Sequence, residues 1–455
     1  MIGSKLIKDH PNPSANVAII LPPYFFFVDV FRTVLENLPN AEFVPDFTQP
    51  LGYSTYSDEY RFALHDYLNE GGFYWRSLEV SNLQPPEFFE KYAVLIANHY
   101  SGYARHPYNK DKKKVRIFYG TAKDSWGFDL RNAYFDLLLC PGPYALENLT
   151  RYSGTAVAIG EPKHDGIVNT PPNHAQKVAA LALTLSLDTN KETILYMPTY
   201  GSLSSIDATL PALISMQVTY NVIVRPHHAT SAHDHRTMDT LRSSSLKILD
   251  SDVSLASALH FADVVVSDSS GSIFDALVAE KPIVLIDTIP DKDEFFVEQP
   301  FYGLEKGRLR GGATHRESID QVVKSEGSEI APTVRLAKKG AAIESFDLRA
   351  SLLRVRERHY RLRQAIVQAK LFSYTDGNAG ERAAATITKF MMEGFPHRDK
   401  TLERLVDELI QRTRNETLSS PELNQKSAMS QLERYQSIRQ LPLLDRLKAV
   451  YETFF

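Results

Sequence analysis

Short apolar runs recur along the chain, each followed by a turn signal and several by a helical pattern. The first series is NVAIILPP, KYAVLIANH, KVRIFYGT, FDLLLCPG and GTAVAIGEP, with a helical pattern over residues 28–38. The second series is ETILYMPTYG, YNVIVRPHH, LKILDS, ADVVVSDSSG and KPIVLIDT. Runs of this length that are rich in Val, Ile and Leu are typical of buried strands. Their alternation with helices predicts an α/β protein with parallel sheets.

The two series are separated by EPKHDGIVNTPPNHA, which is dense in Pro, Asn and Gly. Such a composition marks a linker or a domain edge. We expect a first domain over residues 1–165, a second over 166–395, and a helical segment over 396–455, where LERLVDELIQRT is amphipathic. At about 150 residues per domain, a length of 455 residues agrees with two or three domains.

Composition narrows the class of protein. A hydrophobic content of 43% allows sizeable cores, and a net charge of -4 argues against a general nucleic-acid binder. The single cysteine, Cys140, excludes an intrachain disulfide and a cysteine-based metal cluster, and we interpret it as a buried apolar residue. This usage fits a reducing cytoplasm. We expect no signal peptide and no membrane span, because no apolar run is long enough.

One junction carries candidate chemistry. The valines of DVVVS read as a buried strand, and Ile273, Phe274 and Leu277 recur at helical spacing. Small residues lie between the two, namely Ser269, Ser270, Gly271 and Ser272. The first turn of a helix has unpaired N–H groups and a partial positive charge, so this junction predicts a phosphate site. The alternative is ordinary helix capping by serine.

Five motifs, in order, resemble the bacterial CDP-glycerol glycerophosphotransferases of teichoic-acid and capsule synthesis. The family patterns G-Y-P-R-x-D, Y-x-P-T and an HP after a strand correspond to GEPKHD, YMPT and RPHH. The patterns D-Y-S-S-x-x-x-D and D-G-x-A-x-x-R correspond to DSSGSIFD and DGNAGER. The resemblance covers roughly residues 90–390. It implies a GT-B fold: two Rossmann-like domains with parallel sheets facing across a cleft, and a nucleotide held mainly by the second.

The resemblance also implies site residues. His227 falls on the family histidine and is expected to act on phosphate charge during turnover, with Arg225 or His228 beside it. We expect Asp275 to hold either a ribose hydroxyl or a histidine. The remaining residues expected to bind substrate are Gly120, Thr121, Lys163, Asp165, Thr199, Asp268, Ser269, Ser270, Gly271 and Ser272.

The chain departs from the family at the catalytic base. The family pattern W-H-G-T-x-x-K corresponds here to FYGTAKD, so Tyr119 replaces the histidine and Asp124 the lysine. Tyrosine, with a pKa near 10, is a poor base at neutral pH. Tyr119 either acts with an altered pKa or simply packs on the sheet. Other candidates for the base are His99, Asp124 and His164.

The implied reaction moves a glycerol-phosphate-type group from a CDP-activated donor to an acceptor hydroxyl. We expect no cofactor and no metal, and we interpret DKD at residues 291–293 as solvated charge. Polymer, glycan or lipid-linked acceptors are expected, with possible peripheral contact at the inner membrane face and no nucleic-acid partner. Two alternatives stay open: a GT-B nucleotide-sugar enzyme, such as a glycosyltransferase or UDP-sugar 2-epimerase, and a non-catalytic nucleotide-binding assembly protein.

Overall fold

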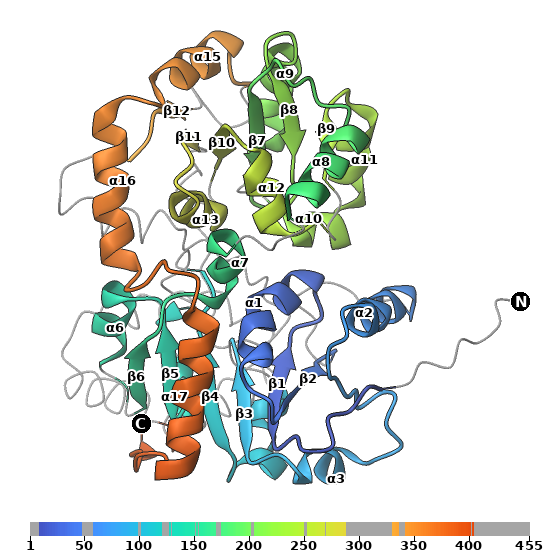
Figure 1. The fold of residues 1–455 in the computed structure, drawn as a ribbon, viewed down its shortest axis with the longest axis vertical. Helices are drawn as coiled ribbons and strands as arrows, with labels where there is room; N and C mark the ends of the chain where they lie inside the picture. The colour runs from blue at the N-terminus through green and yellow to red at the C-terminus, as the bar shows by residue number, and fades with distance from the viewer. Residues whose placement is uncertain are drawn as a thin grey trace, which may run out of the picture.

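The chain folds into two α/β lobes, which Figure 1 shows one above the other. The computed structural model describes residues 9–47, 58–98, 102–120, 127–128, 130–150, 152, 154–169, 174–201, 204–249, 253–268, 270–287, 330–335, 342–401 and 403–404. The described part of the chain contains two six-stranded parallel sheets. The predicted α/β class with two parallel sheets is therefore confirmed.

The first sheet has the order β2-β1-β3-β4-β5-β6. Its strands are β1 (Val17–Leu21), β2 (Ala41–Pro45), β3 (Val94–Ala97), β4 (Lys113–Ile117), β5 (Leu137–Cys140) and β6 (Thr155–Ala158). Around it lie α1 (Phe25–Glu36), α2 (Asp58–Glu70), α3 (Pro85–Glu90), α4 (Gly102–Arg105) and α6 (Pro143–Leu149), with short 3-10 turns at Pro107–Asn109 and Leu130–Tyr134. The sequence pattern indicated every strand of this sheet except β2.

The second sheet has the order β12-β11-β10-β7-β8-β9. Its strands are β7 (Thr193–Met197), β8 (Asn221–Val224), β9 (Lys247–Ile248), β10 (Val264–Ser267), β11 (Ile283–Asp287) and β12 (Thr333–Arg335). Its helices are α8 (His174–Thr184), α9 (Ile206–Met216), α10 (His228–His233), α11 (His235–Ser243), α12 (Leu255–Phe261), α13 (Ser272–Val278), α15 (Ser345–Arg354) and α16 (Arg358–Leu371). Strand β12 was not indicated by the sequence.

Each sheet is covered on both faces, as parallel sheets require. Along β1, Val17 and Ile19 face one core while Ala18 and Ile20 face the other, which is the two-residue period of a strand. The second sheet divides in the same way, with Val264 in one core and Val265 in the opposite one. Cys140 is fully buried in β5, and burial raises the pKa of its thiol to about 12, so its predicted role as a buried apolar residue is confirmed.

The last described helix returns to the first lobe. Helix α17 (Ala379–Glu393) follows α16 and packs Ala383, Ala384 and Ile387 into the core beside α1. Figure 1 shows it running down the lower lobe. The sequence placed this stretch in a second domain ending at residue 395, because periodicity shows that a helix has an apolar face and not which sheet it covers. The amphipathic stretch that begins at residue 402 lies almost entirely outside the described residues.

Candidate active site

The candidate site lies where the carboxyl ends of both sheets meet. In the second sheet, β7 and β10 are neighbours, and the strand order runs in opposite directions on either side of them. Ligands of doubly wound sheets bind at such a switch point. YMPT ends β7 and DSSGS follows β10, so both motifs reach this point. Figure 1 shows α7 (Asp165–Val168) between the lobes, and the 3-10 turn η3 (Pro162–His164) directly precedes it in the chain.

Asp268, which follows β10, forms hydrogen bonds with the loop that follows β7. Its carboxylate accepts hydrogen bonds from the Thr199 N–H at 2.7 Å, and from the Ser205 N–H and hydroxyl at 2.8 and 2.7 Å. Burial raises the pKa of Asp268 to about 6, against these hydrogen bonds, which lower it. The Ser267 hydroxyl adds a bond to the Met197 carbonyl at 2.6 Å. Asp268 therefore holds the loop after β7, including Thr199, in place.

The serines of the junction bind one another. The Ser270 hydroxyl oxygen accepts from the Ser272 hydroxyl at 2.8 Å and from the Ser272 N–H at 3.3 Å. Ser270 is 5% exposed and Gly271 is the N-cap residue of α13. These bonds hold the two serines to each other, and the N-cap residue Gly271 has no side chain that could cap the helix, so capping by serine also stays an alternative. Phosphate binding here stays a prediction, and Ser269 lies outside the described residues.

Two adjacent histidines follow β8. His227 is the N-cap residue of α10, and its Nδ1 accepts the Ala229 N–H at 3.1 Å, so any proton of the neutral ring is on Nε2. Its ring stacks on Tyr200 with centroids 4.5 Å apart. His228 instead crosses to the first lobe and stacks on Phe26, with centroids 5.4 Å apart and planes at 6°. His228 thus contributes to contact between the lobes.

Arg225 is half-buried, with charged groups of both lobes near it. Its Nη2 donates to the Val253 carbonyl at 3.2 Å, and its Nε is a buried donor without a partner in the described part of the chain. Burial lowers the pKa of Arg225, while Asp29 of α1 and Asp275 of α13 act in the opposite direction. Asp29 was not singled out from the sequence, since a lone acidic residue inside a helix resembles ordinary surface charge.

Tyr119 packs among aromatic rings. Its centroid lies 4.7 Å from that of Phe27 and 6.0 Å from that of Phe26. The next residue, Gly120, has a positive φ of 69° and donates its N–H to the carboxylate of Glu161. The two phenylalanines belong to α1, and Tyr119 also packs against the core between that helix and the first sheet, so its ring is a packing residue while its chemical role stays a prediction. The other residues predicted near it, His99, Thr121 and Asp124, lie outside the described residues.

A buried charge cluster joins the lobes around Asp275. Lys163 contacts Asp275 at 2.6 Å and Glu161 at 3.1 Å, and His164 Nε2 lies 2.9 Å from Asp275 Oδ1. Burial alone would raise the pKa of Asp275, but Lys163 and His164 outweigh it and hold the pKa at about 2. Burial likewise opposes the charge on Lys163, yet the two carboxylates raise its pKa above the usual value. Of the two partners suggested for Asp275, the described residues show a histidine.

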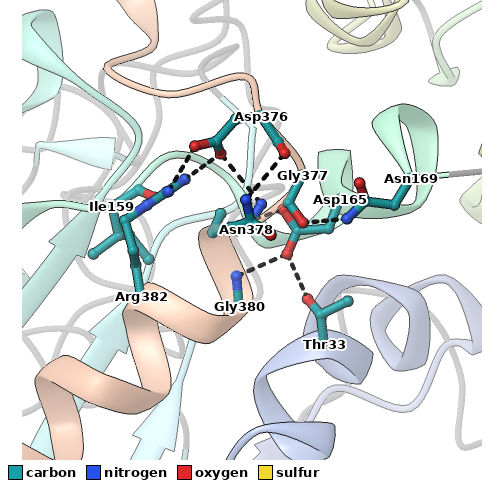
Figure 2. A network of polar contacts seen from close by, with 10 residues as sticks. Thr33, Ile159, Asp165, Asn169, Asp376, Gly377, Asn378, Gly380 and Arg382 are labelled. Carbon is teal, nitrogen blue, oxygen red and sulfur yellow. Dashed lines mark hydrogen bonds and ion pairs between the residues drawn. The ribbon is translucent and has the colours of Figure 1, made fainter.

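Asp165, the last residue of the GEPKHD motif, binds groups of α1 and α17 (Figure 2). Its Oδ1 accepts from the Ala379 N–H at 2.9 Å, and its Oδ2 from the Gly380 N–H at 2.7 Å and the Thr33 hydroxyl at 2.8 Å. A carboxylate at this position satisfies the free N–H groups that begin α17. GEPKHD and DGNAGER, which are far apart in sequence, therefore meet in one structural joint.

Arg382 completes this joint. It forms a two-pronged ion pair with Asp376 at 2.7 and 2.9 Å and donates Nε to the Ile159 carbonyl at 2.8 Å. Figure 2 shows Arg382 and Asp376 next to the Asp165 contacts.

Asp165 was predicted to bind substrate. Its hydrogen bonds to Thr33, Ala379 and Gly380 instead hold α1 and α17 together.

Glu161 was missed by sequence reasoning. It is 1% exposed, contacts Lys163, and has one carboxylate oxygen without a partner among the described residues. The available signal was an acidic residue three positions after the end of β6, where the family pattern has tyrosine. Among the described residues no group of three His, Cys, Asp or Glu side chains is placed to hold a metal ion, and residues 291–293 lie outside them. No described helix is long and apolar enough to cross a membrane.

Part of the chain matches the sequence model of a known protein family. Residues 127–302 match the model of the CDP-glycerol:poly(glycerophosphate) glycerophosphotransferase family. This range contains GEPKHD, YMPT, RPHH and DSSGSIFD, but neither Tyr119 nor DGNAGER. No curated protein matches the chain by sequence.

Solved structures agree on the fold. The wall teichoic acid polymerase TagF is similar at 14% identity and a TM-score of 0.52, covering 84% of this chain and 90% of that one. The UDP-GlcNAc 2-epimerase of Neisseria meningitidis, bound to UDP-GlcNAc, is similar at 12% identity and a TM-score of 0.52, covering 82% and 99%. The predicted GT-B fold is thereby confirmed, and the match over residues 127–302 confirms the resemblance to the CDP-glycerol glycerophosphotransferases.

Proposed function

We propose that this chain transfers a polyol phosphate group, of the glycerol phosphate type, from a CDP-activated donor to an acceptor hydroxyl in the synthesis of a cell-surface polymer. The observation that carries the proposal is the family match over residues 127–302, which contains the motifs at the switch point of the second sheet. The acceptor is a hydroxyl of a polymer, glycan or lipid-linked chain.

The chemistry needs little covalent participation by the protein. The acceptor oxygen attacks the β-phosphorus of the donor, the bond to the bridging oxygen breaks, CMP leaves, and the acceptor proton passes to a base. Catalysis of this type relies on positioning and on neutralising phosphate charge. The groups at the switch point that suit this task are the backbone N–H groups that begin α13, the hydroxyls of Ser270 and Ser272, and Nε2 of His227.

Nucleotide choice and donor consumption test this proposal. CDP should raise the melting temperature more than UDP at equal concentration, because a ligand that binds only the folded state stabilises it by mass action. Incubation with CDP-glycerol or CDP-ribitol should release CMP, while UDP-N-acetylglucosamine should release little UDP. Preference for UDP would favour the nucleotide-sugar alternative. CDP binding without turnover of any donor would favour the non-catalytic one.

A further inference from the structure

The residue at the unspecified position of the family pattern G-Y-P-R-x-D is a histidine in this chain, His164 in GEPKHD. Its ring is 3% exposed and lies in η3, between the lobes. One ring nitrogen, Nε2, contacts Asp275 at 2.9 Å. The other, Nδ1, is buried and has no hydrogen-bond partner in the described part of the chain. This asymmetry needs an explanation, because buried polar atoms are normally paired.

The hydrogen bond to Asp275 sets the tautomer. A carboxylate only accepts hydrogen bonds, so Nε2 must carry the proton that it donates. In the neutral ring the lone pair is then on Nδ1. An imidazolium would instead bury an N–H without an acceptor. The pair therefore has the composition of a carboxylate–histidine dyad, in which the acid orients the ring and the opposite nitrogen is free to take a proton.

The dyad lies close to both halves of the proposed reaction. Asp275 comes three residues after Ser272, so it sits about one helical turn, or ~5 Å, from the start of α13. On the other side, Lys163 and Glu161 connect the cluster to Gly120, directly after Tyr119. A Cβ on Gly120 would lie 3.9 Å from Lys163 Nζ. His164 thus lies between the predicted phosphate site and the position where the family carries its histidine.

We propose that His164 is the general base of this chain, with Asp275 as its positioning residue. The inference rests on the proposed transferase function. As the acceptor oxygen forms its bond to the β-phosphorus and CMP departs, the hydroxyl proton passes to His164 Nδ1. Because His164 and Asp275 belong to different lobes, the dyad is assembled only when the lobes are together. An acceptor held between the lobes would supply the hydroxyl that Nδ1 lacks.

The charged groups around His164 come from several elements. Asp275 lies in α13 and Lys163 in η3. Glu161 directly precedes η3, and Arg225 directly follows β8. The ring of Phe372, after α16, supplies an apolar neighbour with centroids 5.1 Å apart.

Kinetics of His164→Gln test the assignment, with the exposed His235→Gln as matched control. General-base loss typically lowers the rate by about 10²- to 10⁴-fold. We expect a fall of that size in kcat with CDP-glycerol, a smaller change in KM for the donor, and loss of the acid limb of the kcat–pH profile. His235→Gln should behave as wild type. Imidazole should partly restore turnover to His164→Ala. A His164→Gln enzyme that keeps its kcat and its acid limb would overturn the inference while the transferase function stands.

A second measurement needs no turnover. Nitrogen NMR of histidine-labelled protein, with His164 assigned by its loss in His164→Gln, reports which ring nitrogen carries the proton. We expect protonated Nε2 and bare Nδ1 at pH 7.5, and loss of this tautomer preference in Asp275→Asn. A proton on Nδ1 overturns the inference. If wild type consumes no CDP-linked donor, the proposed function fails, and this tautomer result alone decides whether the dyad is as described.

Discussion

The carboxylate of Asp165 accepts the Gly380 N–H at 2.7 Å, across 215 residues of sequence. The same side chain accepts the Ala379 N–H and the Thr33 hydroxyl. This bond fixes the start of α17 against α1 after the chain has traversed the second lobe. It also places Glu161, Lys163 and His164, in the preceding residues, at the boundary between the lobes.

Replacing Asp165 by Ala should destabilise the protein. Each buried group left without a hydrogen-bond partner costs about 1–3 kcal/mol, and three donors lose theirs here. We expect the free energy of unfolding, measured in urea, to fall by at least about 2 kcal/mol. Thr33→Val removes one of the three donors and should cost less. Equal stability of Asp165→Ala and wild type would show that the joint does not hold α17.

Gly380→Ala should also destabilise, for a steric reason. A Cβ at this position would lie 2.2 Å from the Thr33 hydroxyl oxygen, 2.5 Å from its Cβ and 2.6 Å from its backbone carbon. Backbone cannot move aside as a flexible side-chain end can, so α17 must shift away from α1. Thr33→Ala should not restore stability in the double variant. A Gly380→Ala protein with an unchanged melting temperature would contradict this close approach.

Asp268 should give stability a distinctive pH dependence. Its pKa is raised to about 6 in the folded protein from 3.8, so the folded state favours the protonated acid. Its contribution is therefore fully present below pH 4 and is lost as pH rises through 6. A shift of this size corresponds to roughly 3 kcal/mol. The stability advantage of wild type over Asp268→Asn should thus be larger at pH 4.5 than at pH 7.5, by urea unfolding at both values. A constant difference would count against the raised pKa.

Ser270→Ala should weaken CDP binding by roughly 1 kcal/mol, the scale of one hydrogen bond, if the junction holds phosphate. Gly271→Val should weaken it more, because a branched side chain would occupy the place of the phosphate. Ser243→Ala is the matched control, since the Ser243 hydroxyl is exposed and donates to the Thr240 carbonyl in α11. Calorimetric titration with CDP measures all three. If both junction variants bind as wild type does, the serines only cap α13.

Tyr119→Phe should leave turnover nearly unchanged. The ring packs edge-on against Phe27 at 4.7 Å, and phenylalanine preserves that contact. A turnover rate lowered by about 10²-fold or more would assign the proton transfer to the Tyr119 hydroxyl and against His164.

His227→Gln should affect donor binding as well as turnover. It should raise KM for the CDP donor and lower kcat, since His227 is assigned to phosphate charge.

The sequence predicted the strands better than the contacts between lobes. Apolar runs such as VVVS are recognisable because a strand buried on both faces needs them. Strand β2 was not predicted because Glu42 and Pro45 interrupt its run of apolar residues. In the structure Glu42 is buried and binds Lys91 and the Tyr92 hydroxyl. The residues that end the strands were predictable from their motifs.

What those residues touch was not predictable. His164 and Asp275 are 111 residues apart, and no local pattern reports which groups meet when two lobes close. The same applies to Asp165, whose three partners come from α1 and α17. Motif spacing predicted a site near these residues, and only the packing of the lobes shows which groups their side chains bind.

The most direct test of the central claim is phosphorus NMR of the wild-type protein with CDP-glycerol and a glycerol-phosphate oligomer as acceptor. The account predicts loss of the two pyrophosphate signals, appearance of the CMP signal, and an equal gain in phosphodiester signal, because the β-phosphorus changes partners without being hydrolysed. Release of CMP with free glycerol phosphate, or an unchanged donor alongside consumption of UDP-N-acetylglucosamine, would contradict it.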